Sequence, residues 1–203
     1  MSLQATKHRA YRLLKTTYKS IIRLASIVKE IEALVILGID PGVATVGFGI
    51  IEEKGGSSKL IRYGVISTPG RLRLALRLKQ INDDVKQLIE IFKPGAIAVE
   101  ELFWGTNQKT AVTVAQGRAA IILAGEEFNI PMFEYTPLQV KKAVSGYGRA
   151  TKKQVMEMVR RLLNMDNVPK PDDAADALAI AICHARVSSS LLNIKGGNVC
   201  STI

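Results

Sequence analysis

Four acidic residues stand where a carboxylate is costly to place. Asp40 ends the apolar run LVILGID, and Glu100 ends the apolar run AIAVE. Asp173 and Asp176 lie three positions apart at the start of a segment of alanine, leucine and isoleucine. A carboxylate among buried apolar residues is expensive unless it is paired or bound to a metal. Carboxylates gathered from distant segments repel one another, and Mg²⁺ or Mn²⁺ would relieve that repulsion. Two such ions can activate water for phosphodiester cleavage.

Each acid also has an ordinary structural explanation. Asp40 opens the sequence Asp-Pro-Gly, which is turn chemistry, and Glu100 could be a solvated strand end. Asp172 follows a proline and suits an N-cap or first-turn position, where Asp173 would complement the helix dipole. Asp176 lies past the first turn among alanines, so helix capping does not account for it.

Apolar patterning predicts the elements that would position these acids, in an α/β fold with a five-stranded mixed sheet flanked by helices. Turn signals separate three short strands that form an antiparallel meander, over 34–40, 45–51 and 59–68. Two parallel strands then alternate with helices, over 96–103 and 130–136. The expected helices cover about 71–93, about 106–128, 137–144, 151–164 and the segment from 172.

The predicted sheet would bring the acids together. If the first and fourth strands are neighbours, Asp40 and Glu100 meet at one edge of the sheet. In a helix, Asp173 and Asp176 share one face. The alanines around them would let that helix lie close to the sheet.

The charge of the chain favours a polyanionic partner. The 203 residues carry a formal net charge of +10. Such a balance is typical of proteins that bind nucleic acid, although a charged solubilising surface is the alternative. The sequence has no apolar run long enough to span a membrane. The two cysteines, Cys183 and Cys200, lack metal-ligand spacing, which favours a reducing, intracellular setting.

Composition divides the chain into three parts. Residues 1–33 hold seven Lys/Arg against two Glu and have the pattern of an amphipathic helix. That segment could be a DNA-contacting arm, a partner helix, an organelle presequence or an artefact of the start site. Residues 34–187 form the predicted catalytic domain. Residues 188–203 are polar and are expected to be a flexible tail.

Four stretches resemble one known family. These are ILGIDPGVATVGFGII, IAVEELF, FEYTPLQVKKAVSGYGRATKKQV and DDAADALAIAICHA. In order and spacing they closely resemble the bacterial RuvC family of crossover junction endodeoxyribonucleases, over about residues 35–187. The resemblance implies a ribonuclease H-like fold and a homodimer that cuts four-way (Holliday) DNA junctions with Mg²⁺. Residues 1–33 have no counterpart in the family.

The resemblance also implies roles for the acids. The positions that match the family's catalytic, metal-binding carboxylates are Asp40, Glu100, Asp173 and Asp176. They are expected to hold two Mg²⁺ ions, with Mn²⁺ as an alternative, and Asp172 falls outside this set. The expected products carry 5′-phosphate and 3′-hydroxyl ends.

Residues that bind DNA are implied in the same way. Phe103 matches an aromatic residue that meets junction bases, with core packing as the alternative. Lys141 and Lys152 match basic positions near the family's active site, where a cation can bind the scissile phosphate, and Lys141 is expected to act in catalysis. Further contacts to the DNA backbone are expected from Lys142, Arg149 and Lys153.

The resemblance implies a wider biological setting. A two-fold dimer would place symmetric nicks, and helix 106–128 is a candidate part of its interface. A branch-migration helicase complex of the RuvA and RuvB type is the implied partner in homologous recombination and DNA repair. The implied location is the bacterial cytoplasm, in association with the nucleoid.

Three rival hypotheses stay open: a ribonuclease H-like enzyme with another nucleic acid substrate, an ATPase related to sugar kinases and actin, and a junction-binding module without activity.

Overall fold

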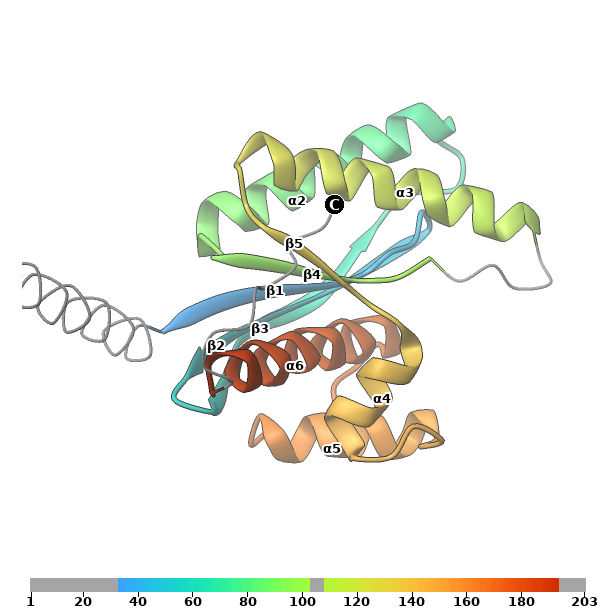
Figure 1. Cartoon of the computed structure of the whole chain (residues 1–203). Helices are drawn as coiled ribbons and strands as arrows, with labels where there is room; N and C mark the ends of the chain where they lie inside the picture. Colours follow the sequence, from blue (N-terminus) through green and yellow to red (C-terminus); the bar gives the residue numbers. More distant parts are fainter. Residues whose placement is uncertain (1–32, 103–107, 194–203) are drawn as a thin grey trace, which may run out of the picture. The chain divides into compact units, whose positions relative to one another are not determined.

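The computed structural model describes residues 33–102 and 108–193 (Figure 1). By contacts within the chain, Leu34–Ile203 forms one compact unit, and Met1–Ala33 is assigned to another. The amphipathic helix predicted for 1–33 lies almost wholly outside the described residues and stays a prediction.

The sheet has five strands in the order β3-β2-β1-β4-β5. β1 pairs antiparallel with β2 and parallel with β4, so the first and fourth strands are neighbours. β2 pairs antiparallel with β3, and β4 pairs parallel with β5. The predicted mixed sheet is therefore confirmed. The strands are β1 (Leu34–Asp40), β2 (Thr45–Lys54), β3 (Ser57–Ser67), β4 (Ala96–Glu100) and β5 (Met132–Tyr135).

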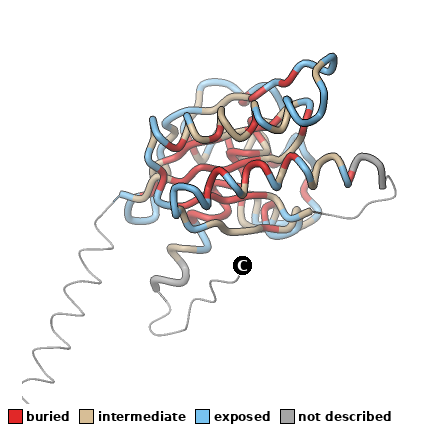
Figure 2. Tube along the Cα trace, turned by 90° about the horizontal axis from the view of Figure 1, so that it is seen from above, coloured by how far each residue is buried: buried red, intermediate tan, exposed pale blue. Residues whose placement is uncertain are grey.

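Helices cover both faces of this sheet. Figure 1 shows α2 and α3 on one face and α6 on the other, with α4 and α5 lying beyond α6. The helices are α2 (Leu74–Phe92), α3 (Gln108–Glu127), α4 (Pro137–Ser145), α5 (Lys152–Leu162) and α6 (Asp172–Asn193). One apolar cluster lies on each side of the sheet, and buried residues concentrate there (Figure 2). Within the described parts, no helix is long and apolar enough to cross a membrane.

The structure corrects several predicted boundaries, including those of one strand and of the last helix. β4 ends at Glu100 rather than at 103. α6 continues to Asn193, so the tail predicted for 188–203 begins later than expected. The Ser188 hydroxyl donates to the Ala185 carbonyl at 2.9 Å, so this side chain is bonded within the helix. Residues 194–203 lie outside the described residues.

Glycines in β1 and β2 let the backbone of α6 lie directly on the sheet. Gly38 and Gly49 are cross-strand partners. A Cβ on Gly38 would come within 2.7 Å of the Ala181 nitrogen, and one on Gly49 within 2.8 Å of the Leu178 nitrogen. Real side chains do not tolerate such distances. Alanines on the helix and glycines on the strands together produce the close approach. The alanines alone were predicted from the sequence to have this function.

His184 of α6 is buried and lies outside the candidate site. It is 4% exposed, and its ring packs against Phe133 of β5. The Tyr135 hydroxyl and His184 Nδ1 are 2.7 Å apart, so the hydroxyl can donate to an unprotonated imidazole. Burial lowers the pKa of His184 to about 4.

Acid should therefore destabilise the protein through His184. The imidazole takes up a proton near pH 6.5 when the chain is unfolded, but only near pH 4 when it is folded. Between those values the unfolded chain binds more protons, so stability falls as the pH falls. From pH 6.5 to pH 5 the loss from this residue is about 2 kcal/mol. Thermal unfolding of the wild-type chain and of His184→Gln across this range measures it. An equal pH dependence in the two proteins would contradict the assignment.

Candidate active site

Asp40 and Glu100 stand side by side at the ends of two parallel strands. The β1–β4 register pairs Ile39 with Val99, and the two acids are the next residues along. The four residues before each acid are buried, and the acids themselves are partly buried. The parallel pairing therefore delivers two carboxylates to one edge of the sheet, as the sequence predicts.

The first turn of α6 brings the other two acids to the same edge. Asp40 pairs across strands with Gly47. A side chain on Gly47 would overlap the main-chain carbonyl of Asp173, so Asp173 lies directly over the neighbour of Asp40. Asp176 lies one helical turn further on and, with Glu100, lines a cavity.

Burial and mutual repulsion disfavour the charged forms of the strand-end acids. The pKa of Asp40 is raised to about 7, first by burial and then by the charges of Glu100, Asp176 and Asp173. The pKa of Glu100 is raised mainly by burial and also by Asp176, while Lys141 and Lys152 oppose the rise. The four acids are therefore close enough to interact, and a cation among them would relieve both effects.

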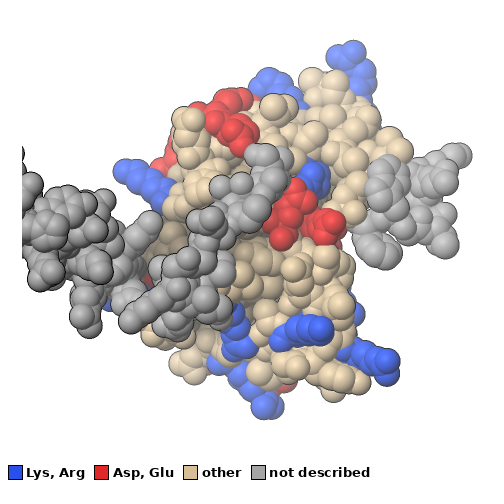
Figure 3. All heavy atoms as spheres, viewed as in Figure 1, with Lys and Arg blue, Asp and Glu red and all other residues tan. Residues whose placement is uncertain are grey.

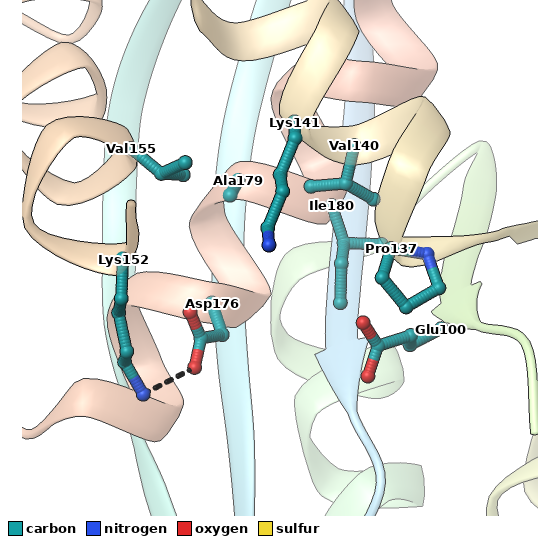
Figure 4. Close-up of a pocket in the computed structure, with 9 residues that line it drawn as sticks. All are labelled: Glu100, Pro137, Val140, Lys141, Lys152, Val155, Asp176, Ala179 and Ile180. Atoms are coloured by element: carbon teal, nitrogen blue, oxygen red, sulfur yellow. Dashed lines mark ion pairs between the residues drawn. The ribbon is translucent and has the colours of Figure 1, made fainter. Parts of the chain in front are cut away.

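Two lysines and two of the acids line one cavity of about 200 Å³. The lysine of α4, Lys141, extends into the space between Asp176 and Glu100 (Figure 4). Lys152, at the start of α5, approaches Asp176 from the other side. The cavity thus combines negative charge with cations that could meet a phosphate. The remaining lining residues are Pro137, Val140, Val155, Ala179 and Ile180.

Lys152 joins α5 to two acids of α6. Its Nζ lies 2.9 Å from Asp176 Oδ2 and 3.3 Å from Asp172 Oδ2. The pKa of Lys152 is raised, chiefly by the hydrogen bond to Asp176. Asp172 stands in the first turn of α6, as expected. Its pairing with Lys152 was missed, and its i, i+4 spacing from Asp176 was the available signal.

The donor set suits a hard divalent ion. Over the described ranges, no three Asp, Glu, His or Cys side chains are grouped so closely that they could hold one metal ion. The Asp176 carboxylate is paired with Lys152 instead. Even so, all four donors are carboxylates, which Mg²⁺ and Mn²⁺ prefer. Apart from burial, the pKa of Asp40 is raised by the charges of Glu100, Asp176 and Asp173, and a cation would offset those charges.

The other residues predicted to bind DNA divide into two groups. Phe103 lies outside the described residues. Lys142, Arg149 and Lys153 are exposed in the α4–α5 region. Figure 3 shows cationic side chains gathered over the part of the surface that α4 and α5 form in Figure 1. A negatively charged backbone that approaches the cavity from this side would meet them.

Known proteins resemble this chain in both sequence and fold. The sequence model described as "Crossover junction endodeoxyribonuclease RuvC" matches residues 36–184. The RuvC proteins of Halothermothrix orenii and Syntrophomonas wolfei are 52% and 53% identical, over 81% and 77% of this chain and 98% and 92% of theirs. The solved structure of Thermus thermophilus RuvC in complex with a Holliday junction substrate is 35% identical, with a TM-score of 0.75 over 78% of this chain and 97% of that chain. The chain belongs to the RuvC family of crossover junction endodeoxyribonucleases, with its ribonuclease H-like fold.

Proposed function

We propose that this chain resolves four-way DNA junctions by paired, symmetric hydrolytic nicks. The observation that carries the proposal is the meeting of Asp40, Glu100, Asp173 and Asp176 beside two lysines, in a chain of the RuvC family. The Thermus thermophilus relative is described in complex with a Holliday junction, which supports the same substrate here.

The chain's own residues have distinct roles in this proposal. The four carboxylates would hold two divalent ions, which supply Lewis acidity and lower the pKa of water. Lys141 and Lys152 attract the scissile phosphate and offset charge that develops on it. Buried strands behind Asp40 and Glu100 keep those carboxylates in place, because the close-packed core resists displacement. The products carry 5′-phosphate and 3′-hydroxyl ends.

The proposal extends to how the protein works with partners. A homodimer would present two such sites to the symmetric strands of a junction, and α3 is a candidate part of its interface. Phe103 would stack on junction bases, and Lys142, Arg149 and Lys153 would bind the DNA backbone. A helicase complex of the RuvA and RuvB type would act with the protein in recombination and repair. The setting would be the bacterial cytoplasm, at the nucleoid. The nuclease domain would begin at residue 34 and not require residues 1–33.

Substrate comparison tests the function. The full chain is expected to cut a four-way junction when Mg²⁺ or Mn²⁺ is present, and to leave linear duplex and RNA–DNA hybrid of the same sequence intact. Labelled strands would show two symmetric nicks, and binding should weaken steeply as salt increases. Preferred cleavage of the hybrid would instead identify a ribonuclease on the same fold. Binding without any cleavage would leave only a junction-binding module.

A further inference from the structure

Two exposed side chains lie at opposite ends of α4, the helix that carries Lys141: Leu138 near its start and Tyr147 in the turn that follows it. Tyr147 is 59% exposed and Leu138 is 53% exposed. A Cβ on Gly148 would lie 2.5 Å from Leu138 Cδ1, so Leu138 packs against the residue that follows Tyr147. Leu138 also follows Pro137, which lines the cavity with Lys141. The two side chains are thus carried by α4 and by the turn after it, the same segment that supplies Pro137, Val140 and Lys141 to the cavity.

The main chain of this turn is held in place at several points. Gly146 ends α4 in the left-handed region, with φ of 75°, and its N–H donates to the Lys142 carbonyl at 2.9 Å. The Ser145 hydroxyl donates to the Lys141 carbonyl at 2.7 Å and accepts from the Tyr147 N–H at 3.3 Å. The Ala150 N–H donates to the Tyr147 carbonyl at 3.2 Å. Because the main chain of this turn is already ordered, little main-chain entropy is lost when the exposed ring binds a partner.

The charges around the two side chains select the kind of partner. Between 137 and 162 the sequence holds seven Lys/Arg and one acid, Glu157. That acid is already bound by Arg160 and Arg161. A cationic surface that contains an exposed aromatic ring matches a nucleic acid strand, whose phosphates meet the cations while a base or sugar meets the ring.

We infer that Tyr147 contacts a nucleotide of the DNA strand that leads into the active site. This inference rests on the proposed function and adds to it a nucleotide contact that carries no charge. The lysines and arginines around the turn hold the strand through its phosphates. The ring holds the strand through stacking or packing, which fixes where the strand lies relative to Lys141 and the acids.

Binding measurements on the full chain test the contact. Affinity for a labelled four-way junction is measured in EDTA, where divalent cations cannot support cleavage. Tyr147→Ala is expected to bind about tenfold more weakly, because a base–aromatic contact is lost. Tyr147→Phe keeps the ring and should bind within about twofold of the wild type. Ile91→Ala, which removes a 68% exposed apolar side chain from α2 on the opposite face of the sheet, is the matched control and should change nothing.

The salt dependence separates the ring from the cations. Tyr147→Ala should leave the slope of log affinity against log salt unchanged, whereas Lys142→Ala should reduce it by about 1. Tyr147→Ala that binds like Ile91→Ala would overturn the inference and leave the two side chains to a protein partner. Tyr147→Phe that binds as weakly as Tyr147→Ala would also overturn it, because the hydroxyl would then carry the contact.

If the wild type binds a junction no better than a duplex, the proposed function fails. The same variants compared on duplex and single-stranded DNA still decide the ring contact.

Discussion

Asp176→Asn is expected to abolish cleavage of a four-way junction almost completely while junction binding is retained. Asp176 faces the cavity shared with Glu100, and its charge contributes to the raised pKa of Asp40 and of Glu100. Asparagine has nearly the same shape but supplies less negative charge to a divalent ion. A loss of several kcal/mol of Lewis-acid stabilisation corresponds to a fall of about 10³-fold in rate. Single-turnover nicking and gel-shift binding measure the two effects.

Asp172→Asn is the matched control for that experiment. Both acids bond to Lys152, at 2.9 Å for Asp176 and 3.3 Å for Asp172. If Asp176 acts by binding a metal, Asp172→Asn should stay within about threefold of wild-type activity, because an exposed ion pair contributes little. If both variants lose activity equally, the function of these acids is to position Lys152. Mn²⁺ binding measured by electron paramagnetic resonance is a second test. Of the two variants, only Asp176→Asn should bind Mn²⁺ more weakly than the wild type.

Gly47→Ala is expected to reduce both stability and cleavage. The added methyl group would overlap the main-chain carbonyl of Asp173, so the start of α6 must move away from the sheet. Overpacking of this kind costs about 1–3 kcal/mol, which lowers the melting temperature by about 2–12 °C in a chain of this size. Cleavage should fall even well below the new melting temperature, because Asp173 and Asp176 move away from Asp40.

Gly70→Ala is the control for the glycine substitution. A Cβ on Gly70 meets no heavy atom within 4 Å, so its melting temperature and activity should match the wild type. Gly47→Ala with unchanged stability and full activity would show that contact between α6 and β2 does not position the acids. Loss of stability with full activity below the melting temperature would show that the contact matters for folding alone.

Local patterns in the sequence predicted most of the fold. Strands with period two, helices with period 3.6 and turn residues between them are properties of neighbouring residues. They placed β1 at its observed bounds and identified α2 and α3. They failed at element ends, where α6 continues past 187 to Asn193.

The candidate site was only partly accessible from the sequence. Apolar residues before Asp40 and Glu100 marked these acids, since burial makes an isolated carboxylate costly. The resemblance to the RuvC family added the roles of Lys141 and Lys152. The i, i+4 spacing of Asp172 and Asp176 indicated that these acids share a helix face, but it did not identify Lys152, which belongs to a different helix, as their partner.

The sequence by itself determined which residues carry charge, which segments bury their side chains and which family the chain resembles. The tertiary structure decided which of these residues meet. Gly38 and Gly47 form a packing surface for the main chain of α6 only because β1 and β2 are paired. The two lysines of α4 and α5 came to line one cavity with Glu100 and Asp176 only once these helices had packed beside α6. Such contacts join residues far apart in the chain, and close packing of the whole core sets them, whereas propensity and periodicity act over a few neighbouring residues.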